Sequence, residues 1–510
     1  MTTDICFRYI FIILRKNQFL LLIAAFFTVY VIQSLLFIPV LNNVNYYSYN
    51  PSDTRKKCHQ FEDRIVHFDL KGAPPRVAYY RKIFPVLRRL NATGILMEYE
   101  DMFPYSGELS VLARNDSYTV EEIYEICQLA KEHKLELIPL IPTFGSVEFL
   151  LKHKKFSHLK EKKDPSTVCP SSEESVELIK KMIKQIYRVH SKVSKLKSIH
   201  IGMNDPPRVG VDNRCKKRLV YELDWNVETL KLEHLTKIAY YAKKKLRLKR
   251  VLVWHDIIVN VNIKTLNESL GALLTPVLWH YDWNSGDDRA FPDGTFAKFA
   301  EVFETMLFAG SFKGNKGEGQ NANDMYYYFH NLFGHIHNCG KHSAILNDTL
   351  SGMIFTGRTR YKHGSTLCEL FPANFPTLIA QLLFLNDNYE MEEKNLLDAT
   401  LKYLEYSGTD PLQPDIIETS NFELYYAHTF TRPVDSNFVD ADFPGKEIYI
   451  EIEKLRLVEW KIENLRKEDT TVVLSEIDTE KQEIENRLRP ALLQYFYEKD
   501  VNEWFVNNFY

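Results

Sequence analysis

The sequence has no surplus of charge of either sign. Its 510 residues include 64 Lys and Arg against 67 Asp and Glu, which gives a formal net charge of -3. Nucleic-acid-binding domains carry a strong positive surface charge, so this balance argues against a nucleic-acid partner. The length allows one large domain of roughly 250 to 350 residues together with accessory segments.

The sequence also lacks the cysteine spacing of metal sites. None of the seven cysteines belongs to a C-x-x-C pair, so we predict no metal and no cofactor. Six cysteines follow the N-terminal region and can form one or two disulfides whose pairing the sequence leaves open. These six are Cys58, Cys127, Cys169, Cys215, Cys339 and Cys368.

Charge is missing altogether from residues 19–38, FLLLIAAFFTVYVIQSLLFI. A run of about 20 apolar residues is long enough to cross a bilayer as a helix. Arg8, Arg15 and Lys16 precede it, and no basic residue follows before position 55. Because basic residues stay on the cytoplasmic side, we predict a cytoplasmic tail over 1–18 and a signal-anchor transmembrane helix over 19–41. A cleaved signal peptide is the alternative, but the run is long for one and lacks an A-x-A-like site.

This topology predicts a single-pass type II protein of the Golgi or another secretory-pathway membrane, with its main domain in the lumen. Four sequons for N-glycosylation fit that compartment. They begin at Asn91, Asn115, Asn267 and Asn347.

After a polar, turn-rich stem over 42–64, two kinds of pattern alternate along the chain. Eight short apolar or β-branched runs are typical of buried strands, and most gaps between them have the periodicity of amphipathic helices. Strands alternating with helices imply a parallel sheet, and eight repeats predict a (β/α)8 TIM barrel over residues 65–385. The predicted strands are 65–70, 95–98, 135–141, 198–202, 251–254, 276–279, 306–309 and 352–356, and the predicted helices are 77–90, 120–133, 173–190, 227–246 and 323–338.

Polar residues follow the carboxyl ends of these predicted strands, which is where the chemistry of a TIM barrel resides. One polar residue at such a position is usually a solvated rim, so the prediction of a site rests on their convergence. They are Asp69, Lys71, Glu98, Glu100, Asp101, Thr143, Asn204, Asp205, His255, Asp256, Tyr281, Asp282, Lys313, Arg358 and Arg360.

Beyond residue 385 the pattern changes to a C-terminal helical region, 386–510. Residues 447–467 and 477–497 are rich in charge and carry apolar residues at helical spacing. We favour a hairpin packed on the barrel over a coiled-coil dimer, because no strict heptad persists over three or four repeats. The oligomeric state is left open.

Eight segments at the predicted strand ends form an ordered set that covers about residues 65 to 385. Together they resemble glycoside hydrolase family 20, in particular its hexosaminidase D branch of β-N-acetylhexosaminidases. The segments are HFDLKGAPP (67–75), EYEDMFPY (98–105), IPLIPTFG (138–145), HIGMND (200–205), VLVWHD (251–256), PVLWHYD (276–282), AGSFKG (309–314) and TGRTRYKHGSTLCELFP (356–372).

The resemblance implies removal of terminal β-linked N-acetylglucosamine or N-acetylgalactosamine from glycans, with the substrate's own acetamide as nucleophile. The family's catalytic pair, Asp-Glu, falls on Asn204 and Asp205. Asn204 then holds the acetamide N–H, and Asp205 protonates the leaving oxygen, for which a largely dry pocket would supply a protonated carboxyl. Tyr281 matches the tyrosine that donates to the acetamide carbonyl.

The resemblance also assigns the remaining walls of a sugar pocket. Arg358 stands where the family has a tryptophan, and Ser146 stands where it has a histidine. Lys362 and His255 replace residues that are commonly acidic in the hexosaminidase D branch. The other residues predicted to bind substrate are Asp69, Glu100, Asp101, Trp254, Asp256 and Trp279.

Three functions remain open from the sequence. The first is a β-N-acetylhexosaminidase whose activity is weakened by the changed catalytic pair. The second is a catalytically inactive protein that keeps the fold to bind a glycan or a protein, because the changed positions are those that stabilise a transition state. The third is a glycosidase with two conventional carboxylates, in which Glu100 or Asp101 partners Asp205.

Overall fold

The computed structural model describes residues 52–55, 57–162, 164–391, 393–406, 442–463 and 472–509. The chain divides into two units, residues 1–53 and 54–510, and the barrel belongs to the second. No helix within the described ranges is both long and apolar enough to span a membrane. The predicted tail and signal anchor, residues 1–41, lie outside those ranges.

Eight parallel strands close into one barrel in the order of the sequence, which confirms the predicted TIM barrel. Each strand pairs with its two neighbours in the chain, and β1 pairs with β8 to close the ring. The strands are β1 (Asp63–Asp69), β2 (Gly94–Glu98), β3 (Glu136–Leu140), β4 (Ser198–His200), β5 (Arg250–Trp254), β6 (Thr275–Trp279), β7 (Met306–Lys313) and β8 (Leu350–Gly357).

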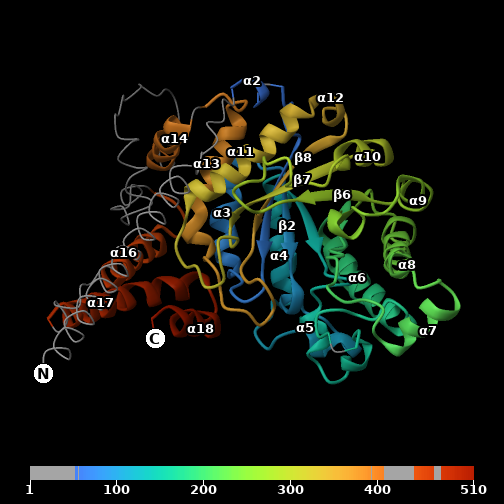
Figure 1. The fold of residues 1–510 in the computed structure, drawn as a ribbon. Coiled ribbons are helices and arrows are strands. Elements are labelled where there is room, and N and C mark those ends of the chain that lie inside the picture. Colours follow the sequence, from blue (N-terminus) through green and yellow to red (C-terminus); the bar gives the residue numbers. More distant parts are fainter. Residues whose placement is uncertain are drawn as a thin grey trace, which may run out of the picture. The chain divides into compact units, whose positions relative to one another are not determined.

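Helices surround the strands, as Figure 1 shows for α3, α4, α6 and α8. The helix predicted over 227–246 ends in a π-helical turn, Tyr241–Lys245. The described helices are α2 (Ser52–Arg55), α3 (Val77–Arg89), α4 (Val120–Glu132), α5 (Glu148–Leu151), α6 (Glu173–Val193), α7 (Asn213–Tyr221), α8 (Val227–Tyr240), α9 (Ile263–Ser269), α10 (Thr295–Val302), α11 (Met325–Lys341), α12 (Ser343–Leu346), α13 (Phe375–Asn386), α14 (Glu393–Tyr406), α16 (Lys446–Glu463), α17 (Val472–Tyr495) and α18 (Glu498–Asn508).

Polar residues at helix starts explain several of these boundaries. Thr119 and Glu122 form a capping box at the start of α4, in which each side chain accepts the other residue's backbone N–H. Asp324 accepts the Tyr327 N–H at the start of α11, and Asp212 accepts the Arg214 N–H at the start of α7. Such caps satisfy N–H groups that have no partner inside the helix.

The inside of the barrel is filled by apolar side chains, and its amino end is closed by an arginine. Arg250 at the start of β5 reaches Asp63 on β1 at 2.7 Å and Glu136 on β3 at 3.0 Å. The barrel is therefore a packed core and not a pore. The apolar interior consists of Ile65, Leu96, Ile138, Leu140, Leu252, Trp254, Val277, Leu307, Ala309 and Ile354.

The C-terminal helices pack on the barrel beside α3. Arg76, at the start of α3, donates its backbone N–H to Tyr495 O at 2.6 Å and its Nε to Phe496 O at 2.9 Å. Tyr79 on α3 donates to Pro444 O at 2.9 Å and packs against the ring of Tyr495. The helix α18 lies beyond the two helices that the sequence predicted in this region.

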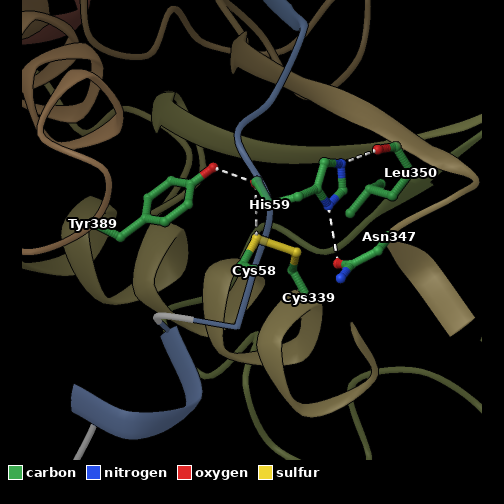
Figure 2. The surroundings of a disulfide bond; sticks show 6 residues. All are labelled: Cys58, His59, Cys339, Asn347, Leu350 and Tyr389. Carbon is green, nitrogen blue, oxygen red and sulfur yellow. Dashed lines mark hydrogen bonds between the residues drawn. A yellow bond between two sulfur atoms is a disulfide. The ribbon is translucent and has the colours of Figure 1, made fainter. Parts of the chain in front are cut away.

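A disulfide fixes the segment that enters β1. Cys58 is bonded to Cys339 on α11, 281 residues later. Figure 2 shows that the neighbouring His59 also binds this part of the barrel, through Leu350 O at 2.7 Å and Asn347 Oδ1 at 3.1 Å. This end of the predicted stem is thus attached to the barrel.

Candidate active site

A pocket of about 270 Å³ opens at the carboxyl ends of the strands. Strand ends and the loop after β8 supply most of its lining. The structure brings together nine of the ten residues predicted for the site, all in this lining. They are Asp69, Glu100, Asn204, Asp205, Trp254, Asp256, Trp279, Tyr281 and Arg358.

The Asn204–Asp205 pair follows β4 after an unusual turn. Gly202 and Met203 both have left-handed backbone, with φ values of 65° and 64°. Glycine adopts this conformation at no steric cost, whereas for methionine it is strained. A Cβ atom on Gly202 would also lie 3.0 Å from Pro142 Cα. The turn brings both residues of the pair to the pocket lining, and strain of this kind is often found at functional sites.

The surroundings of Asp205 differ from the largely dry pocket that the sequence analysis predicted for this carboxyl. Its side chain is 33% exposed, and its Oδ1 lies 2.9 Å from Lys231 Nζ on α8. Glu228 Oε1 lies 3.0 Å from the same ammonium. Burial lowers the pKa of Lys231, but the hydrogen bonds to these two carboxylates outweigh it and raise that pKa overall. In this geometry Asp205 serves as the partner of a cation.

The Asn204 side chain also lines the pocket, and no residue of the described ranges hydrogen-bonds to it. Its carboxamide has an oxygen that accepts and a nitrogen that donates. A ligand in the pocket can therefore use both.

Asp256 connects the Asn204–Asp205 turn to the aromatic side of the pocket. Its Oδ2 accepts the backbone N–H of Asp205 at 2.7 Å, and its Oδ1 accepts the indole N–H of Trp279 at 3.0 Å. Burial raises the pKa of Asp256, an effect that the Asp205 charge reinforces and the two N–H donors reduce. The pocket thus favours the protonated form of this carboxyl more than water does.

Aromatic rings and one guanidinium form a stack along the pocket. The rings of Trp279 and Tyr281 are nearly parallel, with centroids 5.0 Å apart. The Arg358 guanidinium lies 5.3 Å from the centroid of Tyr281 and 5.0 Å from that of Tyr361. Cation–π attraction to both rings holds this side chain. Among the described residues, no carboxylate forms an ion pair with Arg358.

Trp254 forms the floor of the pocket. It is 5% exposed and belongs to the apolar interior of the barrel. Its ring lies against His200, with centroids 4.2 Å apart. Burial lowers the pKa of His200 to about 3, so this histidine is neutral. The floor is therefore apolar and uncharged.

Lys71 contacts three carboxylates that the sequence did not connect. Its Nζ lies 3.0 Å from Asp69, 3.2 Å from Glu98 and 3.5 Å from Glu100. Burial alone would lower the pKa of Lys71, but the carboxylates hold it well above its usual value. Asp69 also accepts the Thr359 N–H at 2.8 Å. Asp69 thus joins β1 to the loop after β8.

Asp101 is the predicted residue that does not line the pocket. Its Oδ2 lies 2.8 Å from Lys152 Nζ and 3.4 Å from His363 Nε2. The other nitrogen of His363 lies 2.7 Å from Glu100 Oε2. Asp101 therefore supports the pocket through His363, which belongs to the loop after β8.

His363 is a lining residue that the sequence reasoning missed. Burial lowers its pKa, but the carboxylates of Asp101 and Glu100 prevail and raise it to about 9. Lys152 Nζ also lies 2.8 Å from His363 Nε2. The available signal was the polar run R-T-R-Y-K-H that follows β8.

His255 lies behind the pocket. It is 7% exposed, and its Nδ1 accepts the backbone N–H of Trp279 at 3.3 Å. Burial lowers the pKa of His255 to about 4, so the ring is neutral. Lys362, in contrast, is exposed and lines the pocket.

Comparison with known proteins gives the family. Human hexosaminidase D is 36% identical to this chain over 357 residues, which are 69% of the chain and 72% of the relative. Bovine hexosaminidase D is 37% identical over 318 residues, which are 62% of the chain and 89% of the relative. The chain belongs to the hexosaminidase D family. Hexosaminidases are glycoside hydrolases, so the pocket described above is the candidate active site of a member of that class.

Other comparisons add little to this assignment. A search against models of protein families found no match. Among solved structures, the alignment with the β-N-acetylhexosaminidase of Bacteroides fragilis covers 72% of the present chain and 71% of the Bacteroides chain, at 14% identity and a TM-score of 0.48. The N-acetyl-β-hexosaminidase of Streptomyces plicatus in complex with Thio-NAglucal covers 69% of each chain, at 14% identity and a TM-score of 0.45.

Proposed function

We propose that this protein is a weakly active β-N-acetylhexosaminidase that removes terminal β-linked N-acetylglucosamine or N-acetylgalactosamine from glycans by substrate-assisted catalysis. The observation that carries the proposal is the convergence of Asn204, Asp205 and Tyr281 on one pocket with an apolar floor. A pocket of about 270 Å³ fits a single sugar ring better than a long chain.

In the proposed mechanism the acetamide of the bound sugar attacks its own anomeric carbon. Tyr281 donates to the acetamide carbonyl, and the Asn204 oxygen accepts the acetamide N–H. Asp205 gives a proton to the departing glycosidic oxygen. Trp254 and Trp279 contact the apolar face of the sugar, as aromatic rings in sugar pockets do.

Two features weaken this catalysis. A neutral Asn204 cannot offset the positive charge that develops on the cyclised acetamide, and losing one such preorganised group costs about 2.7 to 4 kcal/mol. Asp205 is one methylene shorter than glutamate, and a displacement of about 1 Å can cost roughly a hundredfold in rate. Asp205 must also leave Lys231 and take up a proton before it can act as an acid.

The test is turnover of an aryl β-N-acetylglucosaminide and an aryl β-N-acetylgalactosaminide by the full-length protein. We expect slow wild-type turnover and a gain in Asn204→Asp, because the added carboxylate stabilises the cation. Asp205→Asn should abolish cleavage of natural glycans. Glu228→Gln is the matched control, since it removes the other carboxylate of Lys231 without changing the pocket lining. No gain in Asn204→Asp would contradict the assigned roles.

A binding protein without turnover is the second candidate, and the ion pair between Asp205 and Lys231 favours it. A carboxylate that is paired with an ammonium group is a poor proton donor, whereas it can still take part in binding. This candidate predicts measurable affinity for N-acetylglucosamine in calorimetry, with no turnover in the wild type or in Asn204→Asp. The third reading is disfavoured because Glu100 contacts Lys71 and His363, while Asp101 lies outside the lining.

We further propose that the protein is anchored in a secretory-pathway membrane with its barrel in the lumen. The uncharged run over 19–38 supports this topology, and so does the Cys58–Cys339 disulfide, since disulfides form in oxidising compartments. All four sequon asparagines are exposed. In intact microsomes the barrel should resist added protease until detergent is present. Digestion without detergent would contradict the topology.

A further inference from the structure

Two buried cysteines face each other beside the loop that follows β4. Cys169 Sγ and Cys215 Sγ lie 3.3 Å apart, and both side chains are fully buried. Cys169 lies between β3 and α6, and Cys215 lies in the first turn of α7. The two share a small apolar cluster with Leu219 and Leu230. Nothing in the proposed catalysis uses them.

We propose that Cys169 and Cys215 form a second disulfide in the mature protein. Their sulfur atoms would have to approach from 3.3 Å to the bond length of about 2.05 Å, a movement within reach of small side-chain rotations. The protein already contains the Cys58–Cys339 disulfide. A compartment that oxidises one cysteine pair is suited to oxidise another.

A metal site is the competing assignment, because Glu161 lies beside the cysteines. Its Oε2 is 3.3 Å from Cys215 Sγ, and the three side chains could present one ligand atom each. The Glu161 Oε1 is already engaged, since it accepts the backbone N–H groups of Val211 at 2.5 Å and Asp212 at 2.6 Å. Structural zinc sites use four protein ligands. A set of three ligands, one of which already accepts two backbone N–H groups, does not complete such a site. The two cysteines are therefore better suited to a disulfide.

The chemistry of bond formation follows from the contact between the two thiols. The hydrogen bond from Cys169 lowers the pKa of the Cys215 thiol, while the same contact raises the pKa of Cys169. Cys215 is thus the nucleophile. Its thiolate attacks a protein or small-molecule disulfide, forms a mixed disulfide and releases one thiol. The Cys169 thiolate then attacks Cys215 Sγ, closes the bond and releases the second thiol. Two protein thiols are oxidised, the external disulfide is reduced, and its two sulfurs take the two protons.

Burial places this reaction late in folding, when the two thiols are already in contact but the apolar cluster has not yet closed over them. The bond would join residues 46 positions apart, and the enclosed segment contains α6, β4 and the Asn204–Asp205 pair. Glu161 already binds the far end of the loop after β4 through Val211 and Asp212. The disulfide would fix this end covalently. The proposal rests on these contacts and does not depend on the proposed function.

The first experiment maps the thiols of the full-length protein. The protein is produced in secretory cells, denatured in the presence of excess alkylating agent and digested without reduction for mass spectrometry. We expect a linked Cys169–Cys215 peptide pair in addition to Cys58–Cys339, with Cys127 and Cys368 alkylated. Together the two disulfides lower the intact mass by about 4 Da relative to the reduced protein, about 2 Da for each bond. Alkylated Cys169 and Cys215, or either one linked to another cysteine, would overturn the proposal.

The second experiment separates the disulfide from the metal site and measures its effect. The double variant Cys169→Ser/Cys215→Ser should show faster hydrogen exchange over residues 203–212, and each single variant should match it because each breaks the same bond. Cys127→Ser is the control, since Cys127 is a buried free thiol that contacts His190 instead. Stoichiometric zinc in the wild type that is lost in Cys215→Ser would establish a metal site and overturn the proposal, as would unchanged exchange in the double variant.

Discussion

At the scale of single residues, lysines pair with four of the carboxylates that line the pocket. Lys71 serves Asp69, Glu98 and Glu100, and Lys231 serves Asp205. These pairs reduce the negative charge of a site rich in carboxylates. The Asn204 amide fits this pattern, because it adds hydrogen-bonding capacity without adding charge.

The His363 ring gives a prediction about pH. Its pKa in the folded protein is about 9, above the usual 6.5. A histidine whose pKa is higher in the folded than in the unfolded protein stabilises the fold. This contribution is fully present below pH 6.5 and is lost as the pH rises through 9. We expect the wild type to lose on the order of 2 kcal/mol of unfolding free energy from this residue between those limits. Thermal melts of wild type and His363→Gln across pH 6 to 9.5 measure the difference.

The control for this prediction is His158→Gln. His158 also lies near a carboxylate, at 3.0 Å from Glu174 Oε2, but both side chains are more than half exposed. Solvent screens such a pair, so its replacement should leave the pH profile unchanged. Equal profiles for wild type and His363→Gln would show that the carboxylates do not hold a proton on His363.

Arg358 gives a second prediction at this scale. Replacing it with tryptophan should lower KM for an aryl N-acetylhexosaminide by roughly 2- to 10-fold, because aromatic contacts add about 0.5 to 1.5 kcal/mol. The effect on kcat should be small, since the same contact exists in the ground and transition states. Steady-state kinetics check both values. Arg358→Lys keeps the charge without a planar face and should not lower KM. A higher KM in Arg358→Trp would mean that the guanidinium itself binds substrate.

Much of the site could be predicted because strand ends are readable in the sequence. Asp256 and Tyr281 lie two residues after their strands, and Asn204 follows β4 after a short turn, so their convergence follows from the barrel. The surroundings of Asp205 could not be predicted in this way. Lys231 comes from α8, and sequence spacing does not indicate which face of a helix meets a loop 26 residues earlier. The position of His363 depends equally on a loop conformation.

At the scale of elements, the strands and long helices were predictable and the short or uniformly apolar helices were not. All eight strands and the five helices predicted between them overlap the ranges in which their periodicity placed them. The helix α13 (Phe375–Asn386) is buried on nearly all sides and has no polar face to reveal a period. The helix α7 has nine residues and only two buried apolar side chains, Cys215 and Leu219. Such helices are formed by tertiary contacts more than by their own pattern.

The helix α18 supports the pocket and yields a prediction for Glu503. Arg360, which lines the pocket and is 8% exposed, pairs with Glu503 at 2.6 Å. Glu503→Gln removes the charge that compensates a nearly buried guanidinium, so we expect a loss of about 1 to 3 kcal/mol of stability. Hydrogen exchange should become faster over residues 358–367. Glu498→Gln, an exposed position on the same helix, is the control and should have no such effect. Unchanged exchange in Glu503→Gln would show that α18 does not order this loop.

At the scale of the whole molecule, the disulfide between Cys58 and Cys339 joins parts of the chain 281 residues apart. A bond over so long a span restricts the unfolded chain strongly, so we expect Cys58→Ser to lower the unfolding free energy by about 2 to 5 kcal/mol. Calorimetry should show the same loss for Cys339→Ser and for the double variant, since all three lack one bond. A double variant less stable than both singles would mean that the cysteines stabilise the fold separately.

The closed amino end of the barrel restricts the way in which a polymer can bind to this protein. With Arg250 spanning the strands there and apolar side chains filling the interior, the barrel is closed behind the pocket. A polymer therefore cannot thread through the molecule along the barrel axis. Whatever enters must also back out by the same route. For the proposed removal of terminal sugars, the shortened chain would then have to withdraw from the carboxyl face before its new end could enter the pocket.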